Sequence, residues 1–327
     1  PIFSEPFALP DSRENERMTT SGTPVVIRSG AYEAHIASIG ATLRTLTHDG
    51  RDLVVPFDAD EVRPGFRGAT LAPWPNRVVD GRYTFAGEEY RLSLTEPQRG
   101  HALHGLVGWL DFTVAEAGPD AATLTAEVVP QVGYPWRVRV AVTYRLDADG
   151  LTQTVVATNL SEDAAPYGAG PHPYLVAGAA PLDDWTFELP ASEVLEVTAD
   201  RLAPTELVQV DGSSRFDWRT PRALGGVEID HAFTGLARTG GVAAARVTDP
   251  SGTGVEMTWG EELPWVQIHT ADQPDGAANP AHRIGLAVEP MTCAPDAFND
   301  DRYDFDAGLI VLEPGAAATA SWRIAAL

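Results

Sequence analysis

The chain contains no lysine: all 23 of its basic residues are arginine, and 46 Asp and Glu residues bring the formal net charge to −23. Without a side-chain amine, the chain cannot form a Schiff base or anchor pyridoxal phosphate, and it lacks the lysine of a phosphate-binding P-loop. The acidic balance also argues against nucleic acid and against an anionic membrane as partners, because both require a basic surface.

Cysteine is almost absent as well. Cys293 is the single cysteine, which excludes an intramolecular disulfide and a multi-cysteine metal site, and a reducing cytoplasm is the simplest location. No run of about 18 apolar residues is present to span a membrane, and residues 1–17 lack the pattern of a signal peptide. Because Met18 resembles an alternative start, we expect residues 1–17 to be an N-terminal arm or a cloning remnant. Residues 18–327 are then expected to form a single domain, as a monomer or a homodimer.

Alternation of apolar and polar residues with a period of two dominates the chain. Between Trp136 and Leu146, every even-numbered position is apolar or aromatic and three of the odd-numbered positions are arginine, which is a strong signal for a half-buried strand. The turn composition of residues 147–150 predicts a hairpin between this strand and residues 151–159. Further strands are predicted at 32–39, 53–57, 82–85, 90–94, 112–116, 123–129, 185–189, 243–248, 255–259, 265–270, 284–289, 309–312 and 319–325.

Helical periodicity is scarce, and only residues 41–43 and 58–62 are candidates for short helical turns. The 30 glycines and 26 prolines fit many tight connections between short strands. No repeat of fixed period is present, which disfavours a propeller. We therefore predict one large antiparallel all-β domain, a sandwich or a related multi-sheet architecture.

Common catalytic motifs are absent: the chain has no Gly-x-Ser-x-Gly, no His-Glu-x-x-His and no dinucleotide-binding glycine motif. Instead, polar side chains lie beside glycine or proline in several segments. In residues 72–77, two prolines restrict the chain before Asn76 and Arg77; the alternative is a surface loop with a solvated arginine. In residues 100–105, His101 and His104 are candidates for metal ligation, substrate contact or a structural role, but no further metal ligand lies nearby in the sequence.

Two more segments restrict a titratable side chain in a similar way. His172 lies between two prolines after a glycine-rich run, and this rigid backbone suits either a positioned acid–base group or a plain tight turn. Asp230 and His231 precede an apolar pair, where an aspartate is most often a turn or capping residue.

Glu289 is the most unusual residue of the sequence. It ends the almost wholly apolar predicted strand 284–289, and a buried ionised carboxylate without partners costs several kcal/mol. Either an arginine pairs with it structurally or the chemistry of a site engages it.

In this order, the five segments resemble the aldose 1-epimerase (galactose mutarotase) family. The resemblance runs from about Val25 to the end of the chain and includes residues 40–43 and 312–315. It implies a β-supersandwich of large antiparallel sheets, which agrees with the strand pattern. It also implies a sugar as partner and neither metal nor cofactor. The residues that it assigns to the site are Glu289 as catalytic base, His172 as catalytic acid, and Asn76, Arg77, His104 and Asp230 as substrate-binding residues.

The resemblance further implies ring opening of a hexose. Glu289 takes the proton of the C1 hydroxyl while the His172 imidazolium protonates the ring oxygen O5; the aldehyde then turns, and the two groups exchange roles to close the other anomer. A nearby carboxylate is expected to favour the charged imidazole. His101 stands where galactose-type members have asparagine, and the Pro-His-Pro around His172 resembles a divergent branch, so the sugar stays open.

Three alternatives remain beside this interpretation. A mutarotase for an anionic sugar, phosphorylated or sulfonated, would need an arginine cluster, for which Arg63 and Arg67 are candidates, although the net charge opposes anion approach. A glycoside hydrolase would use two carboxylates. A non-catalytic carbohydrate-binding protein of the same fold would keep the arginine and the aromatic residues without the acid–base pair.

Overall fold

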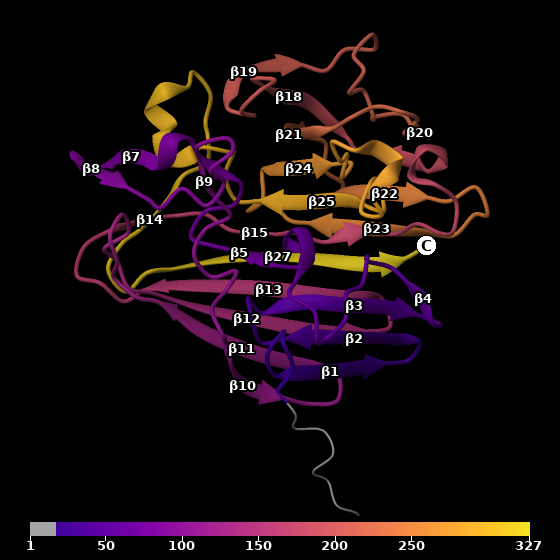
Figure 1. Ribbon diagram of the computed structural model, residues 1–327, viewed down its shortest axis with the longest axis horizontal. Helices are drawn as coiled ribbons and strands as arrows, with labels where there is room; N and C mark the ends of the chain where they lie inside the picture. The colour runs from indigo at the N-terminus through magenta and orange to yellow at the C-terminus, as the bar shows by residue number, and fades with distance from the viewer. Residues whose placement is uncertain (1–17) are drawn as a thin grey trace, which may run out of the picture.

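The computed structural model of the chain describes residues 18–327 and is built mainly from antiparallel β-strands (Figure 1). The predicted arm, residues 1–17, lies outside the described residues. No helix within residues 18–327 has the length and hydropathy that a membrane span requires.

The largest sheet has nine strands and contains the predicted hairpin, which is confirmed. Side chains of β12 and β13 alternate between buried and more exposed positions, as expected for strands that cover a core with one face, and the two strands pair from Val138↔Asn159 to Asp147↔Gly150. The order of the sheet is β10 (Thr113–Ala117), β11 (Ala121–Val128), β12 (Val138–Asp147), β13 (Gly150–Asn159), β27 (Ala317–Ala326), β23 (Gly254–Trp259), β22 (Ala243–Thr248), β17 (Thr186–Glu188) and β20 (Arg222–Ala223).

A six-stranded sheet carries the strands that matter for function. Every residue of its strand β25 is buried, so this strand is covered on both faces. The order of the sheet is β16 (Tyr174–Leu175), β25 (Leu286–Met291), β24 (Trp265–His269), β21 (Asp230–Leu236), β18 (Ala191–Val197) and β19 (Pro204–Gln209).

A four-stranded sheet and several short elements complete the fold. The sheet is formed by β1 (Pro24–Ser29), β2 (Tyr32–Ala37), β3 (Thr42–His48) and β4 (Arg51–Asp52). Two-stranded pairs are β5 (Thr70–Leu71) with β15 (Gly170–Pro171), β6 (Arg77–Val78) with β9 (Ala102–Leu103), β7 (Arg82–Phe85) with β8 (Glu88–Arg91), and β14 (Ala165–Tyr167) with β26 (Ile310–Leu312). Short 3-10 helices are η1 (Pro64–Phe66), η2 (Val79–Gly81), η3 (Leu182–Asp184), η4 (Gly276–Ala278) and η5 (Ala297–Arg302).

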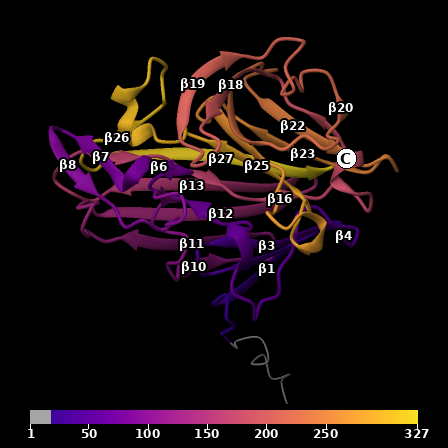
Figure 2. The ribbon, with the colours of Figure 1, turned by 45° about the horizontal axis from the view of Figure 1, so that its top comes forward.

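The sheets are held together by one large hydrophobic core. In both Figure 1 and Figure 2, β27 lies between β18 and β19 of the six-stranded sheet on one side and β1 and β3 of the four-stranded sheet on the other. A single hydrophobic cluster contains buried side chains from all three large sheets, among them Ile36 of β2, Val142 of β12 and Val288 of β25. The predicted all-β architecture of large antiparallel sheets is therefore confirmed.

Most predicted strands match observed ones, and the exceptions have physical reasons. Residues 53–57 contain only an isolated bridge at Val54, so this prediction was wrong. Residues 41–43 are no helical turn but lead into β3, because Thr42 pairs with Ala37 of β2. Residues 58–62 form a non-helical turn. Strands β1, β3, β18, β19 and β21 were not predicted from the sequence, nor were the two- and three-residue strands β4, β5, β6, β9, β14, β15, β16 and β20.

Candidate active site

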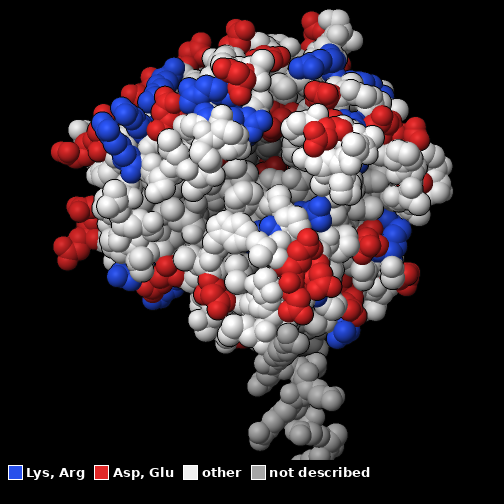
Figure 3. Space-filling model, viewed as in Figure 1, with Lys and Arg blue, Asp and Glu red and all other residues white. Residues whose placement is uncertain are grey.

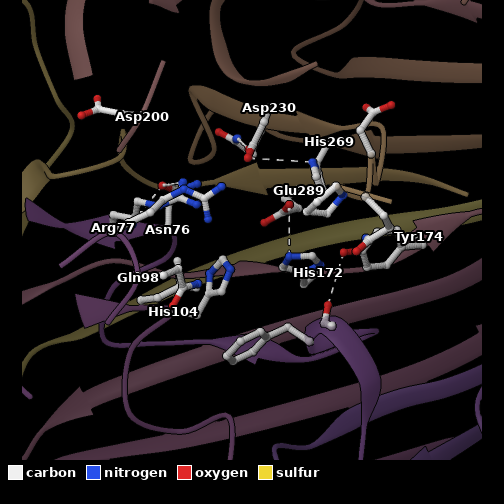
Figure 4. Close-up of a pocket in the computed structure, with 18 residues that line it drawn as sticks. Asn76, Arg77, Gln98, His104, His172, Tyr174, Asp200, Asp230, His269 and Glu289 are labelled. Atoms are coloured by element: carbon white, nitrogen blue, oxygen red, sulfur yellow. Dashed lines mark hydrogen bonds and ion pairs between the residues drawn. The ribbon is translucent and has the colours of Figure 1, made fainter. Parts of the chain in front are cut away.

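A cavity of about 530 Å³ opens beside the six-stranded sheet, within the size range of small-molecule sites. Three neighbouring strands contribute polar side chains to it: Glu289 from β25, Gln267 and His269 from β24, and Asp230 from β21. Loops and the short strands β6 and β16 add the remaining polar groups, among them Arg77 and Tyr174 (Figure 4). Figure 3 shows the hollow on this face of the molecule, between basic and acidic side chains.

Strand register explains why these side chains meet. Gln267 pairs with Glu289, and His269 pairs with Asp230, so each pair is directly opposite across neighbouring strands. Residues 267 and 269 are two positions apart on β24 and therefore point to the same face. The Gln267 side-chain amide donates a hydrogen bond of 2.6 Å to Asp230 Oδ1, which fixes the carboxylate in the cavity wall.

His172 and Glu289 form a close pair at the bottom of the cavity. His172 Nε2 lies 3.5 Å from Glu289 Oε1, and both residues are buried, at 5% and 1% exposure. The backbone of His172 is held on both sides, since its N–H donates to the Ala69 carbonyl and its carbonyl accepts from Gly68 N–H. The two flanking prolines therefore belong to a segment that is also tied down by hydrogen bonds.

Burial sets the protonation of this pair. Burial, together with the nearby Asp230 carboxylate, raises the pKa of Glu289 well above its usual value, although Arg77 opposes the shift. Burial also lowers the pKa of His172 to about 3. The sequence predicted a charged imidazolium at His172. Burial instead favours a protonated Glu289 beside a neutral His172. The pair still carries one transferable proton, the same number as a carboxylate–imidazolium pair.

Arg77 is held in the cavity wall by a buried carboxylate that the sequence did not reveal. Its Nε and Nη2 donate to Glu96 Oε2 and Oε1 at 2.8 and 3.1 Å, and Glu96 is only 3% exposed. Arg99 donates a third hydrogen bond of 2.7 Å to the same carboxylate. Burial alone would lower the pKa of Arg77, but Glu96, Asp230 and Glu289 raise it, so the guanidinium is positively charged.

Asn76 and His104 are brought together by two left-handed turns. Asn76 has φ +53° and His104 φ +61°, and the His104 N–H donates to the Asn76 carbonyl at 2.8 Å. Gly105 follows with φ +73°, and a Cβ there would overlap the Ala72 carbonyl oxygen, so the turn requires glycine. Burial lowers the pKa of His104 well below its usual value, which leaves a neutral ring beside His172 at 5.0 Å between ring centroids.

The cavity is rich in polar atoms that no other part of the described chain satisfies. Within residues 18–327, nine buried side-chain nitrogen or oxygen atoms lack a hydrogen-bond partner, and six of them belong to cavity residues. Each such group costs about 1–3 kcal/mol when it stays unpaired in the interior, so their concentration here indicates a site built for a polar ligand. The six atoms are Arg99 Nε, His104 Nδ1, His172 Nδ1, Gln267 Oε1, His269 Nδ1 and Glu289 Oε2.

Residues 24–325 match the family model described as Aldose 1-epimerase. The chain belongs to the aldose 1-epimerase family. The uncharacterized protein YihR of Escherichia coli K12 is 34% identical over 299 residues, which cover 91% of each chain. The galactose mutarotase of Mus musculus is 27% identical over 310 residues, which cover 85% of this chain and 87% of the relative. This distant identity fits a divergent branch of the family.

Solved structures of aldose 1-epimerase homologues share the fold. A putative aldose 1-epimerase from Escherichia coli K12 superposes with a TM-score of 0.78 at 23% identity, covering 93% of this chain and 99% of the other. The GalM/aldose epimerase homologue from C. elegans gives a TM-score of 0.80 at 20% identity, with 93% and 98% covered. The fold is therefore galactose mutarotase-like, as the resemblance implied.

All six residues assigned to the site from the sequence line the same cavity of this aldose 1-epimerase family member: Asn76, Arg77, His104, His172, Asp230 and Glu289. Their individual roles remain predictions. His101 lies outside the cavity lining: it is fully buried, its Nδ1 accepts from Asp80 N–H, and its Nε2 hydrogen-bonds to the Arg201 carbonyl. We therefore assign a structural role to His101.

The arginines considered for an anionic sugar also lie outside the cavity lining. Arg63 is buried and donates to Thr42 Oγ1 and the Gly108 carbonyl, while Arg67 donates to the Pro56 carbonyl. Among the described residues, no group of three His, Cys, Asp or Glu side chains is arranged to hold a metal ion. That the chemistry needs neither metal nor cofactor stays a prediction.

Proposed function

We propose that the chain is an aldose 1-epimerase that interconverts the α and β anomers of a hexose by acid/base-catalysed ring opening and reclosure. The observation that carries this proposal is the buried His172–Glu289 pair, 3.5 Å apart, in the wall of a cavity whose lining residues carry six unpaired buried polar atoms. Its partner is accordingly a small-molecule sugar.

The reaction needs one proton removed and one supplied, and the pair holds one transferable proton. Glu289 as carboxylate takes the proton of the C1 hydroxyl while His172 delivers a proton to O5; the C1–O5 bond breaks and a C1 carbonyl forms. After rotation about the C1–C2 bond, the reverse transfers close the ring on the other face. The reaction starts from a Glu289 carboxylate beside a His172 imidazolium, and this form arises when the proton of Glu289 moves to His172 Nε2. No proton from solvent is needed, because the pair carries the same number of protons before and after this transfer.

The other cavity residues suit the hydroxyl groups of a neutral sugar. Arg77 presents a planar set of donors, and Asp230 accepts, because His269, Arg77 and Gln267 lower its pKa although burial opposes them. The arginines Arg77 and Arg99 are already paired with Glu96. With Asp230 ionised in the wall as well, the charges favour a neutral sugar over an anionic one.

The test is polarimetry of freshly dissolved α-glucose and α-galactose, with and without the protein. We expect the relaxation to anomeric equilibrium to be faster with the protein. A sugar 6-phosphate is the matched anionic substrate, and faster turnover of the phosphate than of glucose would overturn the neutral assignment. Sugar binding by calorimetry without any acceleration would instead establish a binding protein, and release of nitrophenol from aryl glycosides would establish a hydrolase.

A further inference from the structure

The cavity of the His172–Glu289 pair has an apolar part beside its many polar groups. A sugar ring needs both, because its hydroxyl groups form hydrogen bonds while its C–H groups pack against apolar surface. Three lining residues have large apolar or aromatic side chains: Phe66, Leu103 and Tyr174. Tyr174 is buried, at 8% exposure, whereas Phe66 and Leu103 are only half-buried. Phe66 therefore offers a ligand an accessible hydrocarbon ring.

The Phe66 ring lies beside the reactive residues. Its centroid is 4.7 Å from the ring centroid of His104 and 6.3 Å from that of His172. In the proposed reaction C1 is at Glu289 and O5 is at His172, so the sugar ring that contains both atoms comes close to Phe66. The polar groups of β21, β24 and β25 remain available for its hydroxyls.

The backbone at Phe66 has a conformation that bulky residues rarely adopt. Phe66 has φ +56° and follows Gly65 with φ +50°. The turn is closed by the Arg67 N–H, which donates to the Pro64 carbonyl at 3.0 Å. A left-handed conformation costs free energy in any residue with a side chain, and such strain is retained chiefly at functional positions. This conformation places the phenyl ring in the cavity wall.

Two side chains outside the cavity lining hold the Phe66 ring. Arg63 Cζ lies 5.7 Å from the centroid of Phe66 and 4.3 Å from that of Trp109, and the two rings are 6.0 Å apart. Arg63 is itself fixed by hydrogen bonds to Thr42 Oγ1 and the Gly108 carbonyl. Burial lowers the pKa of Arg63 to about 10, so the guanidinium is charged at neutral pH and attracts both rings.

We propose that Phe66 is a substrate-binding residue whose ring packs against the C–H face of the reacting sugar, and that Arg63 and Trp109 position this ring. An aromatic face makes no directional hydrogen bond to the C1 hydroxyl, so it holds both anomers and the open aldehyde alike. The inference rests on the proposed function for the reaction, but sugar binding at Phe66 can be measured without turnover.

The experiment uses two ligands and two substitutions of Phe66. Calorimetry with 1,5-anhydroglucitol, a glucose ring that lacks the C1 hydroxyl and cannot open, measures binding alone, and polarimetry with glucose measures kcat and KM. Phe66→Ala should weaken 1,5-anhydroglucitol binding and raise KM by about 30-fold. Phe66→Leu, which keeps apolar bulk but loses the flat face, should do so by about fivefold. In both variants kcat should stay within about threefold of wild type, because the contact is equal in ground state and transition state.

Trp109→Ala tests the support of the ring from outside the cavity lining. Trp109 is 55% exposed, so its removal leaves the core intact. We expect KM to rise about threefold in wild type and to stay unchanged in the Phe66→Ala background, because both substitutions act through one contact. The control is Phe305→Ala, which removes another half-buried ring that packs on Trp265 at 5.7 Å and does not line the cavity. It should change KM by less than about twofold.

Each outcome decides one of the proposals. Glucose turnover with an unchanged KM in Phe66→Ala would overturn the sugar contact and leave the epimerase proposal intact. A lower kcat with a shifted pH profile and an unchanged KM in Phe66→Leu would also overturn it, because Phe66 would then act on proton transfer at His172. An effect of Trp109→Ala that is absent in wild type, or that persists without Phe66, would overturn the positioning role.

The epimerase proposal has its own failure. If 1,5-anhydroglucitol binds and Phe66→Ala weakens this binding, but glucose shows no anomer exchange, the epimerase proposal is wrong and the sugar contact at Phe66 stands. If neither sugar binds to the wild type, both are wrong.

Discussion

Strands β12 and β13 of the nine-stranded sheet differ from strands β24 and β25 of the six-stranded sheet in what they bury. Along β12, buried Val138, Val140 and Val142 alternate with more exposed residues such as Arg139. Along β25 every residue is buried, and Glu289 is among them. On β24, Gln267 is likewise a buried polar residue within an apolar strand.

The difference teaches where sequence polarity has a functional meaning. On β12 the polar residues face solvent, and no ligand is needed to explain them. On β24 and β25 a polar side chain has left water and faces a cavity instead, which costs free energy unless something hydrogen-bonds to it. Polarity on the buried strands therefore identifies the site, whereas polarity on the half-exposed strands identifies the surface.

The strongest test of this contrast replaces a carboxylate in each sheet. Glu289→Gln should lower kcat for anomer exchange by about 1,000-fold, within the range for loss of an acid–base group. At a pH near 4.5 it should leave Tm within about 3 °C, because the neutral carboxyl and the amide have nearly the same shape. Polarimetry and thermal unfolding measure the two quantities.

The matched control is Glu256→Gln on β23, whose carboxylate pairs with Arg246 at the surface of the nine-stranded sheet. We expect kcat within about twofold of wild type for this variant. Near-wild-type turnover by Glu289→Gln would show that Glu289 is a structural acid.

The second prediction concerns a core residue of the nine-stranded sheet, whose substitution should lower stability strongly and leave turnover unchanged. Leu146 of β12 is 1% exposed and belongs to the main hydrophobic cluster. Leu146→Ala should cost about 2–5 kcal/mol in the free energy of unfolding, measured by urea denaturation. Well below the unfolding transition, kcat and KM should match wild type. A changed kcat at full folding would mean that the core of the nine-stranded sheet also positions the site.

The sequence predicted the half-exposed strands best, because their burial pattern repeats every two residues. The strand predicted at 243–248 coincides with β22. Residues 41–43 were misassigned, because a short apolar run does not distinguish a helical turn from a strand; pairing with β2 decides it. Strand β18 was missed because Ser192 and Glu193 interrupt its alternation.

The site was predictable only as separate segments. Asn76, His104 and His172 could be noticed because each lies beside glycine or proline. Glu96 could not, since its partner Arg77 is 19 positions away and the pairing exists only in the folded chain. Gln267 and His269 carried a usable signal: two polar residues at alternate positions of a predicted apolar strand.

A third prediction concerns how stability depends on pH. The folded-state pKa of Glu289 is raised above 4.5, so the folded protein retains a proton that the unfolded chain releases. The resulting stabilisation is complete below pH 4.5 and is lost as pH rises toward the folded-state pKa, by about 1.4 kcal/mol per pH unit. Glu289→Gln has no such proton.

The free energy of unfolding of Glu289→Gln should therefore increase relative to wild type as the pH rises above 4.5 toward the folded-state pKa. Urea denaturation at several pH values measures the difference. Glu256→Gln, on the half-exposed side of the comparison, should follow wild type throughout. A pH-independent difference for Glu289→Gln would show that Glu289 is ionised in the folded protein.

The smallest effect concerns Glu96, which touches Arg77 and Arg99 but does not line the cavity. Glu96→Gln keeps the size of the side chain and loses the charge-assisted hydrogen bonds to Arg77, which are roughly twice as strong as neutral ones. Arg77 should then be held less firmly against the sugar. KM should rise about tenfold, equivalent to about 1.4 kcal/mol, with kcat within about threefold of wild type.

The control is Glu89→Gln, which breaks an exposed pair with Arg91 on the β7–β8 hairpin and should leave KM unchanged. A fall in kcat at constant KM for Glu96→Gln would contradict a positioning role. It would mean instead that the charge of Glu96 acts on the proton transfer at His172 and Glu289.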